Sequence, residues 1–175
     1  MFDTLISSKT RINLLLKFFL NPGCTSYLRE LAEEFNESTN GIRLELNKFE
    51  KAGMLSSNVE GNRKFFKANK DYPFYDEIRS TLMKYTGIGH IIDQLVQHLG
   101  KLERVYLAGE YANGRQSDII DIVLVGNINK TYLVKMIEKT QKIINKKIRY
   151  LIYTAVEFKH ESITSGMLLL YDAKK

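Results

Sequence analysis

The chain has 175 residues, of which 44% are hydrophobic and 26% charged, an ordinary balance for a folded protein. Its 26 lysines and arginines exceed its 20 aspartates and glutamates, and the net charge of +6 favours anionic partners. The single cysteine, Cys24, excludes an internal disulfide framework and a cysteine-rich zinc site, and no apolar run reaches the about 18 residues of a transmembrane helix. The first residues lack a basic segment ahead of an apolar stretch, so we expect a cytoplasmic protein with no membrane partner.

Residues 1–72 are expected to form one domain of three helices and a hairpin. Apolar residues recur at helical spacing in three segments, 10–20, 27–35 and 38–52. Two strand-like runs follow at 54–59 and 64–68. Gly61-Asn62 lies between these runs, and such a pair favours a tight turn.

The third helix of this domain has two chemically different faces. Ser38 is its expected cap, and Ile42, Leu46 and Phe49 form an inward apolar face. Polar and cationic side chains occupy the opposite face and the hairpin: Ser38, Thr39, Asn40, Arg43, Asn47, Asn62, Arg63, Lys64 and Lys67. These residue types suit contacts with base edges and phosphates.

The pattern over residues 8–70 resembles the winged helix-turn-helix of ArsR- and MarR-like regulators. The resemblance implies double-stranded DNA as the partner. Asn40, Arg43 and Asn47 would read bases, because asparagine pairs with adenine and arginine with guanine, while the other polar residues would hold phosphates. An alternative stays open, since some winged helices bind protein and nearby carboxylates would repel phosphate: Glu37, Glu45 and Glu50.

The rest of the chain predicts linking helices over 73–100 and a small α/β domain over 101–175. Four strand-like segments and one amphipathic helix are expected in this domain: strands at 104–108, 119–125, 148–154 and 167–171, and a helix at 131–145. The run at 119–125 is almost entirely apolar, which is typical of a strand covered on both faces. We therefore expect an α+β protein of two domains.

The stretch 107–126 resembles the signature of minimal nucleotidyltransferases of the polymerase-beta-like superfamily. In active members, as the resemblance implies, a glycine turn cradles phosphate and aspartates hold Mg²⁺ on the triphosphate. The candidate nucleotide-binding residues in this sequence are Gly109, Gly114, Ser117, Asp118 and Asp121.

The sequence departs from that signature at several positions. Glu110 replaces the serine of the glycine turn, Ile119 occupies the place of the first aspartate, and Arg149 or Tyr150 falls where a third carboxylate is expected. Asp118 and Asp121 would point to opposite faces of a strand unless a bulge intervened. We therefore expect no metal site and no cofactor, with Mg²⁺ required only if the domain is active.

Together the two resemblances lead us to expect a sequence-specific DNA-binding transcriptional regulator with a catalytically inactive nucleotidyltransferase-like domain. The linking helices over 73–100 could form a dimer interface, so we expect a homodimer on double-stranded DNA. The alternative is an active Mg²⁺-dependent nucleotidyltransferase that uses a nucleoside triphosphate to modify a protein or small molecule. A pure protein-interaction module is a third possibility.

Overall fold

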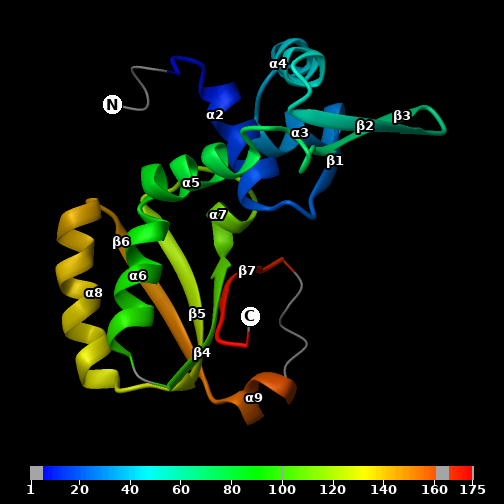
Figure 1. Ribbon diagram of the computed structural model, residues 1–175. Coiled ribbons are helices and arrows are strands. Elements are labelled where there is room, and N and C mark those ends of the chain that lie inside the picture. Colours follow the sequence, from blue (N-terminus) through cyan, green and yellow to red (C-terminus); the bar gives the residue numbers. More distant parts are fainter. Residues whose placement is uncertain (1–5, 100, 161–165, 175) are drawn as a thin grey trace. The chain divides into compact units, whose positions relative to one another are not determined.

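The computed structural model describes residues 6–99, 101–160 and 166–174, so some bounds of the predicted domains (residues 1, 100 and 175) lie outside it. The fold is mixed α+β with two sheets, in agreement with the expected class (Figure 1). The chain forms two compact units, with the boundary between Leu82 and Met83. No helix in the described ranges has the length and apolar character needed to cross a membrane.

The first unit contains helical segments and a small three-stranded sheet. The helical segments are α2 (Lys9–Leu15), the π-helical turn η1 (Leu16–Leu20) that continues it, α3 (Leu28–Phe35) and α4 (Thr39–Lys51). Ser38 caps α4 by accepting a hydrogen bond from the Gly41 amide at 3.2 Å. Ile42, Leu46 and Phe49 are buried, so the predicted inward face of this helix is confirmed.

The sheet of the first unit includes a strand that the sequence did not reveal. The expected hairpin consists of β2 (Leu55–Glu60) and β3 (Arg63–Ala68), and β1 (Thr25–Tyr27) pairs antiparallel with β3. A strand of three residues is too short to display an alternating pattern. Its central residue, Ser26, is buried and donates a hydrogen bond to Glu30 at 2.7 Å, which ties β1 to the first turn of α3.

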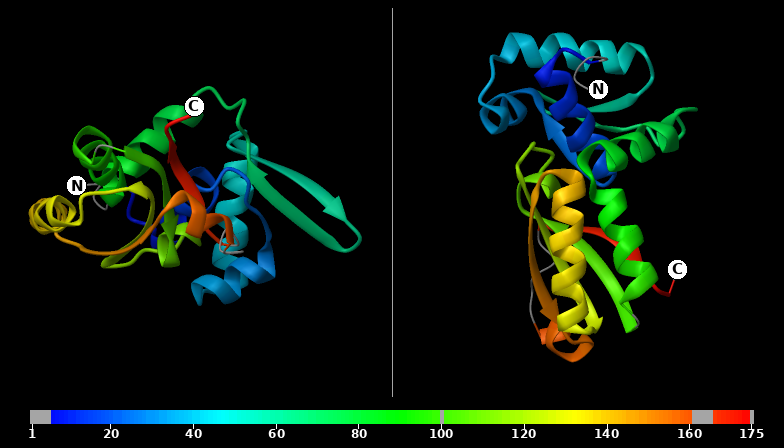
Figure 2. Two further views of the ribbon diagram at one scale, coloured as in Figure 1. Left: turned by 90° about the horizontal axis from the view of Figure 1, so that it is seen from below. Right: turned by 90° about the vertical axis from the view of Figure 1, so that its left-hand side faces the viewer.

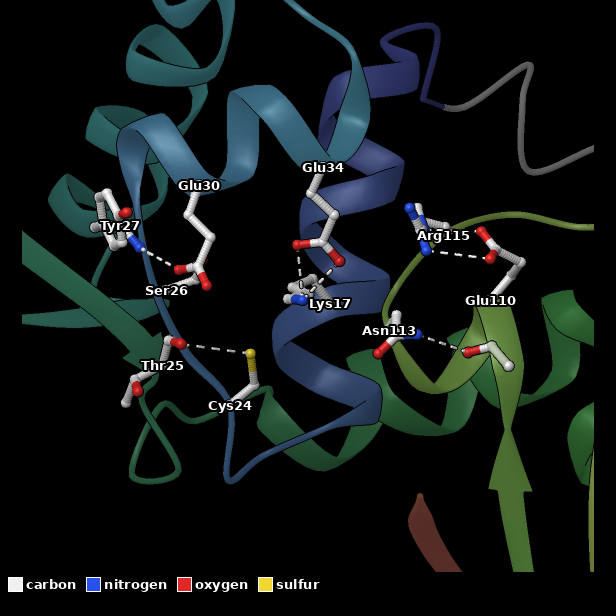
Figure 3. A network of polar contacts seen from close by, with 11 residues as sticks. Lys17, Cys24, Thr25, Ser26, Tyr27, Glu30, Glu34, Glu110, Asn113 and Arg115 are labelled. Carbon is white, nitrogen blue, oxygen red and sulfur yellow. Dashed lines mark hydrogen bonds and ion pairs between the residues drawn. The ribbon is translucent and has the colours of Figure 1, made fainter. Parts of the chain in front are cut away.

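A half-buried ion pair joins η1 to α3 in this unit. The Lys17 ammonium donates to both carboxylate oxygens of Glu34, at 2.7 and 2.8 Å (Figure 3). The contact joins η1 to α3, which are separated by the loop before β1. It therefore links two helical segments that are not consecutive in the chain.

The second unit is built on a four-stranded sheet of order β6-β5-β4-β7. Its strands are β4 (Lys101–Ala108), β5 (Ile119–Asn127), β6 (Lys147–Tyr153) and β7 (Leu168–Asp172). Its helices are α6 (Ile88–His98), α7 (Gly109–Ala112), α8 (Lys130–Ile144) and α9 (Ala155–His160), and α5 (Tyr75–Thr86) runs across the boundary between units. Only β5 and β6 run parallel among the paired strands described, because α8 connects them as a crossover.

Both faces of the strand β5 are covered, as its apolar run predicts. Figures 1 and 2 show α6 and α8 side by side on one face of the sheet. On the other face, Val123 and Val125 pack with Tyr106 and with Phe158 of α9. Because side chains alternate along a strand, Asp121 lies on the same face as Val123.

Candidate nucleotide-binding site

One end of the four-stranded sheet brings a glycine turn against a carboxylate. Ala108, the last residue of β4, lies opposite Asp121 of β5 in the antiparallel register. Gly109 follows with φ of 63°, a conformation that glycine adopts without steric penalty. A Cβ atom on Gly109 would collide with the carboxylate of Asp121, so the backbone of the turn packs directly onto that side chain.

The carboxylate of Asp121 is held by an arginine on the neighbouring strand. Asp121 and Arg149 are partners in the parallel register of β5 and β6. Arg149 donates from Nε to Oδ1 at 2.6 Å and from its terminal nitrogen to Oδ2 at 2.9 Å. This pairing raises the pKa of the guanidinium, which is charged at all physiological pH values in any case. The sequence left Arg149 and Tyr150 as candidates for the position facing Asp121, and the register shows that Arg149 occupies it.

Asp118 does not join Asp121. The register of β5 with β6 runs without a shift from Ile119 to Val125, so no bulge rotates Asp118 onto the face of Asp121. Asp118 instead lines an open cavity of about 870 Å³ together with residues of α8 and the start of β6, among them Lys142 and Lys147. The opposite orientations expected for the two aspartates agree with this geometry.

The other candidate residues of the motif have local structural contacts. The Ser117 hydroxyl accepts a hydrogen bond from the Ile119 amide at 3.0 Å, which shapes the entry into β5. Gly114, with φ of 78°, forms the turn after α7. Glu110 forms an ion pair with Arg115 at 2.7 Å, so much of its negative charge is compensated (Figure 3).

The side chains at this edge of the sheet limit how a metal ion could be held. No group of three or more carboxylate, histidine or cysteine side chains suited to a metal ion occurs in the described ranges. Mg²⁺ in nucleotide sites is commonly bound by one or two carboxylates together with substrate phosphates and water. Asp121 therefore fits as the protein ligand of a metal ion that arrives on a nucleotide, and it would need release from Arg149 to serve in this way.

The residues predicted to contact DNA are partly gathered in the first unit. A cavity of about 580 Å³ lies between α4 and the hairpin. The predicted residues that line it are Arg43, Asn47, Asn62, Arg63 and Lys64, whereas Ser38, Thr39, Asn40 and Lys67 do not. Arg29 of α3 also lines the cavity and was missed, because its position at the start of a helix gives no distinguishing signal in the sequence.

Glu33 lines this cavity, whereas two further carboxylates of α4, Glu45 and Glu50, are paired with cations. Glu45 accepts hydrogen bonds from Arg11 at 2.8 Å and Lys48 at 3.0 Å, and the bond from Arg11 is the main cause of its lowered pKa. Glu50 pairs with Lys64 at 2.7 Å, so this lysine contributes less net charge to the cavity than its position suggests. Whether the predicted residues bind DNA stays a prediction.

Comparisons with known proteins identify no family for the chain but do identify solved structures with similar parts. No family model matches, and no curated protein sequence matches significantly. A protein from Sulfolobus solfataricus described as a nucleotidyltransferase is 21% identical, with a TM-score of 0.39, over 56% of this chain and 88% of its own. A mutant toxin–antitoxin complex MntA-HpeT gives 18% identity, a TM-score of 0.40, and coverage of 50% and 73%. The tri-AMPylated HEPN toxin of Shewanella oneidensis in complex with the MNT antitoxin gives 16%, 0.37, and coverage of 50% and 71%.

These neighbours overturn the main function expected from the sequence. They include a protein described as a nucleotidyltransferase and the antitoxin partner of an AMPylated toxin, whereas the expectation was a DNA-binding transcriptional regulator. That expectation is wrong, and the alternative of nucleotidyl transfer is the one these neighbours favour. The sequence misled because a polar helix face beside a basic hairpin describes a surface and does not identify what the whole chain does. Since the TM-scores lie below 0.5, no residue role is transferred from these structures.

Proposed function

We propose that the second unit is a nucleotidyltransferase-type domain that binds a nucleoside triphosphate at the edge formed by Gly109 and Asp121. It would transfer a nucleotidyl group from that triphosphate to a protein or a small molecule, with cleavage of the bond between the α- and β-phosphates and release of pyrophosphate. The single observation that carries the proposal is the contact of the Gly109 turn with the Asp121 carboxylate, where no Cβ would fit. A glycine turn whose backbone lies beside a carboxylate is a combination that can serve a metal-bound phosphate group.

Each residue at this edge has a role in the proposed reaction. Asp121 would hold the Mg²⁺ of the nucleotide, and that ion would neutralise charge on the phosphates during transfer. Gly109 lacks a Cβ, so its turn can lie directly against the carboxylate that would hold the ion. Arg149 supplies a cation beside the same carboxylate.

The test is transfer of label from α-³²P-labelled ATP, GTP, CTP or UTP, with Mg²⁺, to a cell lysate and to the chain itself. We expect labelled product with at least one of these nucleotides and its loss in Asp121→Asn. Asp118→Asn is the matched control, because Asp118 lies three residues away and lines a cavity whose lining residues do not include Asp121. Equal labelling by the wild type and Asp121→Asn, or labelling by neither, would contradict the proposal.

The first unit supports a separate proposal about a partner. We propose that residues 8–70 form a winged helix-turn-helix whose cavity binds the phosphate backbone of double-stranded DNA, with no role in regulating transcription implied. Cations from α3, α4 and β3 line this cavity, namely Arg29, Arg43, Arg63 and Lys64. Lysines and arginines that neutralise phosphates release counterions, which makes such binding depend on salt.

Fluorescence anisotropy with a labelled duplex at several salt concentrations tests this partner. We expect Arg43→Ala combined with Lys64→Ala to weaken binding and to flatten the salt dependence, because about one unit of slope is lost per phosphate contact. Lys139→Ala, on α8 of the other unit, is the control and should leave both unchanged. Identical salt slopes in all three proteins would refute the proposal.

The expected homodimer also remains a prediction, which light scattering of the full chain checks.

A further inference from the structure

We propose that Arg149 is a partner-switching residue of the nucleotide site. Its guanidinium pairs with Asp121 when no nucleotide is bound, and it transfers to the nucleotide phosphates when a nucleoside triphosphate enters, which frees the carboxylate. The inference rests on the proposed function, since it assigns the ligand of the same site. It adds a residue that the motif in the sequence does not supply.

The sheet itself places the two side chains together. Asp121 and Arg149 are register partners on adjacent parallel strands. Partners in a parallel register project to the same face, so neither strand needs to distort to make the contact. The pair is bidentate, with Nε and a terminal nitrogen of the guanidinium each bonded to one carboxylate oxygen.

Exposure of the two side chains makes the arginine the partner that moves. The Arg149 side chain is 67% exposed, whereas that of Asp121 is 19% exposed and lies against the Gly109 turn. Because most of the guanidinium is exposed, water can solvate it when the pair opens, whereas the carboxylate cannot leave its position as easily. The carboxylate stays in place while the guanidinium can rotate into solvent.

The chemistry of the guanidinium suits the exchange. Its fork of N–H donors matches a phosphate group in the same bidentate way as it matches a carboxylate. The other nearby carboxylate, Glu110, is paired with Arg115, so it competes weakly for Arg149. A triphosphate carries more charge than Asp121 and is therefore the stronger attraction once it arrives.

The consequence is that the metal ion and the nucleotide bind different members of one ion pair: the metal ion needs Asp121, and the nucleotide needs Arg149. A metal ion alone must displace Arg149 from Asp121, so its binding should be weak. A metal-free nucleotide must attract Arg149 away from Asp121. Removing either partner therefore should help one ligand and harm the other.

The test measures two affinities in the full-length protein: Mn²⁺ alone by electron paramagnetic resonance, and ATP in excess EDTA by calorimetry. We expect Arg149→Gln to bind Mn²⁺ several-fold more tightly and ATP about ten-fold more weakly, the effect of losing about one charge-assisted hydrogen bond. Asp121→Asn should show the reverse, with weaker Mn²⁺ binding and tighter ATP binding. Arg149→Lys keeps the charge but loses the bidentate fork, so its ATP affinity should be intermediate.

A purely structural ion pair predicts a different outcome. Arg149→Gln and Asp121→Asn would then lower the melting temperature slightly and leave the affinities for Mn²⁺ and ATP unchanged. That result would overturn the partner switch. Binding of Mg²⁺-ATP by the wild type with equal affinity in Arg149→Gln would also overturn it, while leaving the proposed function intact. Absence of binding for all four nucleoside triphosphates, with or without Mg²⁺, would refute both proposals.

Discussion

Replacing Gly109 by alanine tests the close approach on which the proposed site depends. Gly109 has φ of 63°, and an added Cβ would meet the carboxylate of Asp121. The left-handed conformation costs an L-residue about 1–2 kcal/mol, and forcing extra atoms into packed surroundings adds about 1–3 kcal/mol. Because the side chain of Asp121 must move to relieve the collision, its pairing with Arg149 should be lost as well.

A second glycine of the same unit provides the control. Gly166 has φ of 82°, but a Cβ built on it has no atom within 4 Å, so Gly166→Ala introduces the backbone strain alone. Urea denaturation should therefore show a loss of about 2–5 kcal/mol for Gly109→Ala and about 1–2 kcal/mol for Gly166→Ala. ATP binding should be lost only in the first variant. Equal destabilisation and equal binding in the two variants would refute the close approach.

Other features of the structure lead to further measurable outcomes. Leu124→Ala should destabilise the second unit by about 2–5 kcal/mol because this side chain is fully buried, whereas Leu151→Ala, at an exposed position, should change stability by less than about 0.5 kcal/mol in the same urea titration. The pKa of Glu45 is lowered chiefly by its hydrogen bond from Arg11, so its stabilising effect is fully present above the unfolded value of about 4.3 and is lost as pH falls through the folded value. Glu45→Gln should therefore unfold with a weaker dependence on pH below about 4.3, and an unchanged acid titration would contradict this. Burial raises the pKa of Cys24, so iodoacetamide at neutral pH should modify it more slowly than a free cysteine peptide, and an equal rate would contradict its burial.

Much of the fold was predictable because its helices and strands follow periodic patterns. The α4 helix has both a cap at Ser38 and apolar residues at helical spacing, and its inward face is buried as expected. The strand β5 is an almost continuous apolar run, which indicated coverage on both faces. Short elements were missed for a physical reason, since β1 and α7 contain too few residues for any period to appear.

The candidate site was less predictable because it depends on register. The sequence indicated Asp121 and the glycine turn, but it left Arg149 and Tyr150 as equal candidates for the facing position. Local sequence does not determine which residue of one strand lies beside which residue of another, and a shift of one residue exchanges the two faces. The pairing of Asp121 with Arg149 is therefore a tertiary property, set by the packing of α8 and β6 against β5.

That register also sets the electrostatic character of the site. A second carboxylate at position 149 would repel Asp121 and favour a metal ion that remains bound between the two side chains. The arginine instead leaves the pair neutral, so neither a free metal ion nor a free phosphate is strongly attracted, and a ligand that brings both charges has the advantage. The metal–nucleotide complex that we propose as the ligand is of this kind, because its cation would bind Asp121 while its phosphates would bind Arg149. If the proposal is correct, the same ion pair that weakens a resident metal site favours recognition of the intact complex.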